Sequence, residues 1–290
     1  MILFLNYARS GGTLLNRALA NDDEIIIVSE VNRLGSGASS TIPAMVKGGI
    51  TRQLSLWYDI EMDSKDFIDE ISNLKEIQVK FNKTVVVRDW TFIDFYPHFL
   101  NGYKPSYKLS STDVNADVVF ALIRNPMDIW LSRDEPLSVF FKNYSRYIRC
   151  INDNKVKCFE YELMVSEPLS FFNDLYNYVG INKKLSYEGF FNVKNASGDL
   201  QNKNEMNEKK EFVDTSNKVV SEKRKAAFIN FIASKPEYFF VVEPYLKNIT
   251  QRPTYHETYL NYASKNIKLY TKFPIRRILE DLRWRLNFNV

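Results

Sequence analysis

The sequence predicts an α/β protein of three layers, in which helices cover both faces of a central parallel sheet. Short apolar runs, typical of strands that are buried on both faces, alternate with stretches of helical periodicity. A turn containing two glycines links the first apolar run to the first helical stretch. The 290 residues are 45% hydrophobic, which is enough apolar material for one sizeable core. Together these observations favour a parallel sheet with crossover helices.

The expected strands are five short runs rich in apolar and β-branched residues: Ile2–Asn6, Glu24–Val28, Thr84–Arg88, Val118–Ile123 and Lys155–Phe159. The expected helices lie between and after them: Thr13–Ala20, Lys65–Lys80, Met127–Ile148 and Pro168–Val179. Residues that favour helix ends support these limits. Ser64 is the expected N-cap of the second helix, Asn125 with Pro126 starts the third, and Gly180 ends the fourth.

Two stretches fall outside this alternation. Segment 194–218 is polar, nearly devoid of large apolar residues, and expected to be a long loop. The tail, 254–290, places seven lysines and arginines among aromatic residues and leucines. We expect the tail to be a helical extension packed on the domain. The alternative is a basic amphipathic surface that contacts a membrane, a partner or another copy of the chain.

Composition argues against several classes of function. A net charge of +4, from 39 basic and 35 acidic residues, does not by itself indicate nucleic-acid binding. Two cysteines and two distant histidines favour neither a disulfide framework nor a metal site. No apolar stretch approaches the roughly 20 residues that span a bilayer, and the apolar start lacks a basic leader. We therefore expect a cytoplasmic protein.

The turn after the first strand reads Arg9-Ser10-Gly11-Gly12-Thr13. Small residues allow consecutive backbone N–H groups to converge, and the following helix directs its positive end to the same point. An arginine adds a fork suited to an oxyanion. The turn therefore predicts an anion site, with an ordinary strand-to-helix turn as the alternative. It lacks the lysine of a Walker A loop and the glycine spacing of a dinucleotide fingerprint.

A second anion site is predicted at Ala121–Arg133. Arg124 follows an expected strand, at the sheet edge where open α/β proteins bind ligands. Ser132 stands eight residues further on, in the helix that begins at Asn125-Pro126. Arginine and serine at this spacing could hold one phosphate together. The alternative is an arginine in a loop ion pair and a serine on a solvated helix face.

Three stretches resemble motifs of sulfotransferases that use 3′-phosphoadenosine 5′-phosphosulfate (PAPS). Arg9–Leu15 resembles the loop that binds the 5′-phosphosulfate, and Arg124–Ser132 resembles the motif that binds the 3′-phosphate, spacing included. Tyr161–Pro168 is similar to a third motif, Tyr-Glu-x-Leu-Val-x-x-Pro. The resemblance extends to about Gly180 and implies the P-loop-like sulfotransferase fold and PAPS as co-substrate, without a metal. The residues it implies for nucleotide binding are Arg9, Ser10, Gly11, Gly12, Thr13, Leu14, Arg124, Ser132 and Tyr161.

The resemblance also suggests catalytic residues. Glu30 follows the second expected strand, where tyrosylprotein and bacterial carbohydrate sulfotransferases carry a glutamate that acts as base; capping or pairing with Arg33 is the alternative. His98 competes for the role of base, because cytosolic sulfotransferases use a histidine. Arg88, in an expected exposed Arg-Asp pair, resembles a lysine of the tyrosylprotein enzymes that stabilises the transferring group; a structural pair with Asp89 is the alternative. Arg9 would assist at the same group.

The expected function is therefore transfer of a sulfuryl group from PAPS to a hydroxyl, with a carbohydrate as the favoured acceptor. Protein tyrosine or a small metabolite are alternative acceptors. A catalytically silent nucleotide- or glycan-binding module and a phosphate-transferring kinase are alternative functions. Segment 32–45 and the stretch after Gly180 are the expected acceptor loops. The expected organisation is a sulfotransferase domain over 1–250 and a basic extension over 251–290.

Overall fold

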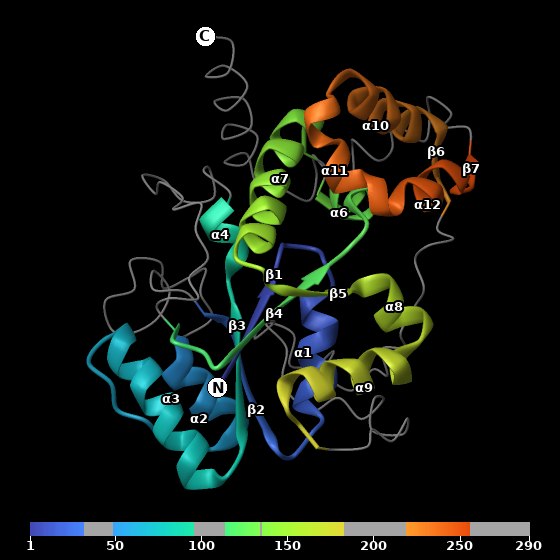
Figure 1. Cartoon of the computed structure of the whole chain (residues 1–290). Coiled ribbons are helices and arrows are strands. Elements are labelled where there is room, and N and C mark those ends of the chain that lie inside the picture. Colours follow the sequence, from blue (N-terminus) through green and yellow to red (C-terminus); the bar gives the residue numbers. More distant parts are fainter. Residues whose placement is uncertain (32–48, 96–113, 134, 183–218, 256–290) are drawn as a thin grey trace, which may run out of the picture. The chain divides into compact units, whose positions relative to one another are not determined.

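Figure 1 shows a computed structural model of the chain, which describes residues 1–31, 49–95, 114–133, 135–182 and 219–255. The chain divides into two compact units. The first comprises Met1–Ser216 with Glu237–Leu246, and the second comprises Asn217–Pro236 with Lys247–Val290. The expected boundary near residue 250 stays a prediction.

The first unit is built on a five-stranded, wholly parallel sheet with the strand order β2-β3-β1-β4-β5. The strands are β1 (Ile2–Asn6), β2 (Ile25–Val31), β3 (Thr84–Asp89), β4 (Val118–Ile123) and β5 (Lys157–Glu160). All five predicted strands are present, and the predicted parallel α/β class is confirmed. β1 and β4 have the predicted limits, because their apolar runs stop at polar residues that also end the strands.

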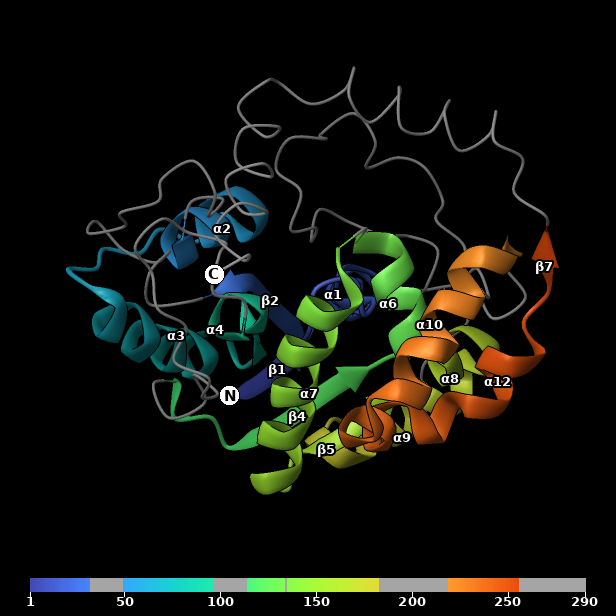
Figure 2. The same cartoon turned by 90° about the horizontal axis from the view of Figure 1, so that it is seen from above.

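Helices cover both faces of this sheet, so the predicted three-layer arrangement is confirmed (Figure 2). α1 (Gly12–Ala20), α8 (Tyr161–Ser166) and α9 (Pro168–Val179) share a core with one face, in which Phe4 stacks on Phe120. On the other face, Tyr7 packs against Tyr144 and Tyr147 of α7 (Leu137–Asp153). Shorter elements complete the unit: α2 (Gly49–Tyr58), α4 (Thr91–Phe95), η3 (Pro236–Tyr238), α11 (Phe239–Val242) and η4 (Glu243–Tyr245).

Two helix predictions need correction. The helix expected over 127–148 is two helices, α6 (Pro126–Arg133) and α7. Pro136 immediately precedes α7 and, lacking an N–H, cannot continue α6. α3 (Phe67–Phe81) is capped by Asp66, which accepts from the N–H of Asp69 (3.0 Å), and not by Ser64.

Other helix ends are as predicted. The side chain of Asn125 accepts from the N–H of Met127 (3.0 Å), so asparagine caps α6 and Pro126 is its first residue. Gly180 ends α9 in the left-handed region, with φ 76°. Both ends follow from local chemistry, because a side-chain oxygen satisfies a free helix N–H and glycine tolerates positive φ.

The second unit contains α10 (Glu222–Ser234) and α12 (Leu246–Gln251), with β6 (Val220–Ser221) paired in parallel to β7 (Thr254–Tyr255). Lys225 donates to the carbonyls of Thr250 (2.7 Å) and Arg252 (2.8 Å), which places a cation at the end of α12. The predicted loop 194–218 and the tail beyond residue 255 lie outside the described residues. Within the described ranges, no helix has both the length and the apolar character needed to cross a membrane.

Candidate functional site

The predicted site residues gather where parallel strands of the first unit end. Glu30 lies near the end of β2, Arg88 near the end of β3, and Arg124 directly follows β4. The turn 7–11 follows β1, which is central between β3 and β4. Because carboxyl ends of parallel strands meet at one edge of a sheet, four separate sequence stretches reach the same place.

The turn after β1 places no capping side chain at the N-terminus of α1. Arg9 and Gly11 both have positive φ, 72° and 97°. Ser10 is buried, and both its N–H (3.1 Å) and its hydroxyl (2.6 Å) donate to the carbonyl of Tyr7, so its hydroxyl shapes the turn. Gly11 is the N-cap of α1 and has no side chain that could occupy the first N–H groups of the helix. The positive end of α1 is therefore suited to an anion.

Both glycines are also required by close neighbours. A Cβ atom on Gly11 would lie 2.2 Å from Cδ2 of Tyr161, and one on Gly12 would lie 2.5 Å from the side-chain amide of Asn6. Neither distance is possible for a real side chain, and Gly11 has positive φ in addition. The sequence identified the turn but not these two neighbours.

The two predicted anion sites adjoin each other. The guanidinium of Arg124 lies over the ring of Tyr161, 4.1 Å from its centroid, and Nη1 of Arg124 donates to the carbonyl of Arg9 (3.0 Å). The same Tyr161 ring covers Gly11. Ser132 is exposed on α6 and its hydroxyl donates to the carbonyl of Ile129 (2.7 Å). Arg124, Tyr161 and the turn thus form one cluster, whereas the Ser132 hydroxyl bonds within its own helix.

Arg88 is the central cation of a second cluster. Its Nε donates to Oδ1 of Asn6 (2.7 Å), and its Nη1 donates to the hydroxyls of Ser29 (3.2 Å) and Thr13 (3.4 Å). The expectation of an exposed Arg-Asp pair was wrong, because Arg88 is 7% and Asp89 2% exposed. Burial lowers the pKa of Arg88, and the charge of Glu30 opposes that shift.

Glu30 lies in an irregular part of β2. The pairing register between β2 and β3 shifts between Val28 and Val31, and Glu30 has a φ of 55°. An irregularity of this kind re-aims a side chain, and positive φ is uncommon in non-glycine residues. The Glu30 carboxylate lies 4.0 Å from Nη2 of Arg88. The competing base His98 and the alternative partner Arg33 lie outside the described residues.

Three supporting residues were missed by the sequence analysis. Asn6 fixes Arg88, and Ser29 receives a second bond from the side-chain amide of Asn16 (2.7 Å). The amide of Gln53, on α2, pairs with both backbone groups of Ser29: it accepts from the N–H (2.6 Å) and donates to the carbonyl (2.8 Å). Polar residues at strand ends could have indicated Asn6 and Ser29. Nothing in the sequence indicated Gln53, because its helix was not predicted.

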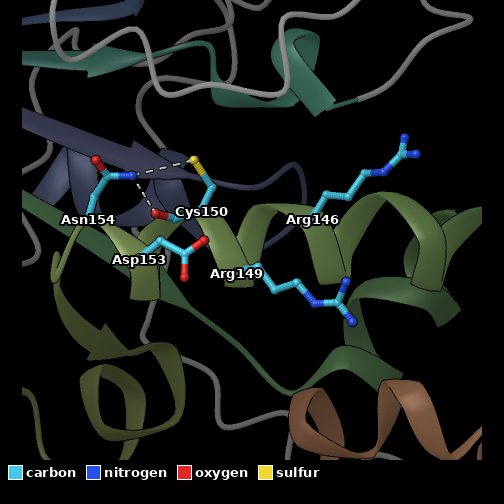
Figure 3. A pocket seen from close by; sticks show the side chains of 5 residues that line it. All are labelled: Arg146, Arg149, Cys150, Asp153 and Asn154. Atoms are coloured by element: carbon cyan, nitrogen blue, oxygen red, sulfur yellow. Dashed lines mark hydrogen bonds between the residues drawn. The ribbon is translucent and has the colours of Figure 1, made fainter.

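A separate hollow of about 280 Å³ lies at the end of α7 (Figure 3). It is lined by Arg146, Arg149, Cys150, Asp153 and Asn154, all on or next to one helix. The two arginines extend away from the cysteine and the asparagine, whose side chains contact each other (Figure 3). These side chains do not converge on a common point, and none belongs to the two clusters described above.

Comparisons with known proteins bear on the fold. No protein-family model and no curated protein matches the sequence. Among solved structures, the sulfotransferase domain from the olefin synthase of Synechococcus PCC 7002 is similar, with a TM-score of 0.52 and 15% identity, over 74% of this chain and 84% of that chain. The sulfotransferase domain from the curacin biosynthetic pathway follows with a TM-score of 0.48 and 12% identity, over 69% and 84% of the two chains. Mouse sulfotransferase SULT7A1, complexed with PAP, has a TM-score of 0.35 and 16% identity, over 64% and 60%.

The first of these similarities identifies the fold, since its TM-score exceeds 0.5. The chain has the sulfotransferase fold: an α/β unit with a central, wholly parallel sheet flanked by helices. The predicted fold is therefore confirmed.

Proposed function

We propose that the chain is a PAPS-dependent sulfotransferase that transfers a sulfuryl group to a hydroxyl acceptor. One observation carries this proposal. Arg88 lies between the candidate base and the anion-binding turn, with Nη2 4.0 Å from the Glu30 carboxylate and Nη1 3.4 Å from the hydroxyl of Thr13. A base, a buried cation and a helix N-terminus at one sheet edge are the groups that such a transfer requires.

The nucleotide would bind across the two adjoining anion sites, at the turn after β1 and at Arg124. The turn from Arg9 to Leu14 offers the positive end of α1 to the 5′-phosphosulfate, with Ser10 shaping the turn. Arg124 supplies a charged fork for the 3′-phosphate, and Ser132 stands on the helix that follows. Tyr161 offers an apolar ring between them. The close approach of Tyr161 to Gly11 and of Asn6 to Gly12 supports binding of the nucleotide here, because side chains at the two glycine positions would fill the turn.

The residues present support an in-line transfer without a metal. The acceptor hydroxyl gives its proton to the carboxylate of Glu30 as its oxygen forms a bond to sulfur. The bond between sulfur and the phosphate oxygen of the donor breaks, and the electron pair leaves with adenosine 3′,5′-bisphosphate. Arg88, with Arg9 and the first N–H groups of α1, stabilises the charge on the sulfuryl oxygens, as cations do in phosphoryl transfer.

Carbohydrate is the acceptor class we propose. The support is the resemblance of the Glu30 arrangement to that of bacterial carbohydrate sulfotransferases. Protein tyrosine and small hydroxyl compounds are the other acceptors to be tested, since segment 32–45, the expected acceptor loop, lies outside the described residues.

Two measurements test the proposal. Calorimetry should detect binding of adenosine 3′,5′-bisphosphate and much weaker binding of ATP; a preference for ATP would refute the nucleotide assignment. A sulfur-35 transfer assay from labelled PAPS should then label at least one member of a panel of glycans, tyrosine peptides and phenols. Bisphosphate binding without any transfer would indicate that the protein is a catalytically silent binding module and not an enzyme. Label found only on peptides or phenols would refute the carbohydrate assignment.

A further inference from the structure

The peptide group between Arg124 and Asn125 is held from two sides. Its carbonyl accepts a hydrogen bond from the hydroxyl of Tyr144 on α7 (3.1 Å). Its N–H donates to Oε1 of Glu162 on α8 (2.9 Å). Because a peptide group is planar, holding both ends sets the orientation of its plane. That orientation determines the direction in which the chain leaves Arg124, and hence where its guanidinium can reach.

The position of the Arg124 guanidinium depends on this hold. The side chain meets two neighbours at once, the ring of Tyr161 at 4.1 Å and the carbonyl of Arg9 at 3.0 Å. Glu162 directly follows Tyr161 in the first turn of α8. The first turn of α8 therefore supplies both the ring that contacts the Arg124 guanidinium and the carboxylate that accepts from the backbone directly after Arg124.

The Glu162 carboxylate is in an unusual electrostatic position. The residue as a whole is half-buried, but Oε2 is shielded from solvent and has no hydrogen-bond partner among the residues that the structure describes. Burial raises the pKa of Glu162 to about 7, against the hydrogen bond from Asn125. The groups that act on it from packed elements are Arg124, which lowers the pKa, and Asp128 of α6, which raises it. Tyr144 of α7 and Tyr245 of η4 also interact with it electrostatically.

We propose that Glu162 is a positioning residue of the nucleotide site, and that it takes up a proton when the 3′-phosphate of the nucleotide binds at Arg124. The proposal rests on the proposed function. A proton on Oε2 leaves Oε1 able to accept from Asn125, so the neutral form keeps its hold on the backbone. A phosphate near Arg124 disfavours a neighbouring carboxylate, which raises the pKa of Glu162 in the complex. Affinity is then full below the pKa of the free protein and falls as the pH rises through the pKa of the complex.

Calorimetry with adenosine 3′,5′-bisphosphate between pH 7 and 9 tests this without an acceptor. The range lies above the second phosphate pKa, about 6, so the ligand keeps its charge. A rise of one pKa unit on binding separates the affinities of the fully protonated and fully deprotonated limits by about tenfold. Because the pKa of Glu162 in the free protein is about 7, about fivefold of this loss should fall between pH 7 and pH 9. Paired buffers of different ionisation enthalpy should report proton uptake near pH 7. Glu162→Gln should keep the neutral-pH affinity, lose the pH dependence and the proton uptake, and bind more tightly than wild type at pH 9.

Further variants separate the positioning role of Glu162 from the effect of its charge. Glu162→Ala and Tyr144→Phe each release one side of the Arg124–Asn125 peptide group, and both should weaken binding; only Tyr144→Phe should keep the pH dependence. Glu160 is a neighbouring exposed carboxylate, and Glu160→Gln should bind the bisphosphate with the affinity and pH dependence of wild type. A pH dependence unchanged in Glu162→Gln would overturn the proton uptake, and wild-type affinity in Glu162→Ala would overturn the positioning role. Absence of bisphosphate binding in wild type would instead refute the proposed function.

Discussion

Replacing Gln53 by methionine is expected to misplace Glu30 and abolish most sulfuryl transfer. β2 is an edge strand, and its outward backbone groups are paired by side chains of α2. Gln53 pairs with both groups of Ser29, directly before Glu30. Tyr58 pairs in the same way with Ile27, which lies two residues before Ser29. The Tyr58 hydroxyl accepts from the N–H of Ile27 (2.8 Å) and donates to the carbonyl of Ile27 (3.2 Å). The helix thus completes the edge in place of another strand.

The two side chains provide a matched pair of variants. A buried polar group left without a partner costs about 1–3 kcal/mol, and Gln53→Met and Tyr58→Phe each release two such groups. We expect a loss of about 2–4 kcal/mol in the free energy of unfolding for each, since water reaches part of an edge strand. Burial raises the pKa of Tyr58 to about 12, so its hydroxyl stays a donor throughout the assay range.

Transfer should distinguish these two variants. A displacement of about 1 Å in a catalytic group can cost 10²-fold, so Gln53→Met should lower transfer from PAPS by about that factor. Tyr58→Phe should retain transfer close to wild type, because Ile27 precedes the irregular part of β2. Urea denaturation measures the stability of both variants, and sulfur-35 transfer at a temperature where both are folded measures activity. Full transfer by Gln53→Met, or an equal loss in Tyr58→Phe, would refute the role of Gln53.

Three further outcomes are expected at the candidate site. Arg124→Ala should weaken bisphosphate binding by about 1.5–3 kcal/mol in calorimetry, the range for hydrogen bonds to charged groups; unchanged affinity would remove Arg124 from the site. Glu30→Gln should bind bisphosphate normally yet transfer sulfate about 10²–10⁴-fold more slowly, and retained turnover would make His98 the candidate base. Gly11→Ala should bind no bisphosphate, because positive φ costs about 1–2 kcal/mol and the new methyl displaces Tyr161. Gly180→Ala has the same kind of φ and nothing within 4 Å of its Cβ, so it should lose stability but keep affinity.

Local signals predicted elements well where they were strong. The apolar runs of β1 and β4, the proline that starts α9 and the glycine that ends it gave the observed limits. The prediction was wrong where one local signal outweighed another. The helical periodicity after Asn125 extended across Pro136, whose missing N–H ends that helix and separates α6 from α7. Ser64 was a plausible cap, but Asp66 makes the capping bond.

The candidate site was predictable only in part. The turn 9–13 and the corner at Arg124 could be found because each places a known kind of anion ligand directly after a strand. The environment of Arg88 could not be found, because its partners Asn6 and Ser29 belong to two other strands. The hold of Gln53 on Ser29 and that of Glu162 on Asn125 likewise join residues that are 24 and 37 positions apart.

The sequence by itself determined the alternation of strands and helices, the position of the glycine turn and some helix ends, such as the start of α6 and the end of α9, because these depend on neighbours within a few residues. The tertiary structure alone decided that Arg88 is buried beside Glu30 and that Arg124 reaches the carbonyl of Arg9. The reason is the strand order, β2-β3-β1-β4-β5, which sets β1 between strands that begin about 80 and 115 residues later in the chain. Contacts across such separations are fixed by the packing of the sheet and not by local pattern.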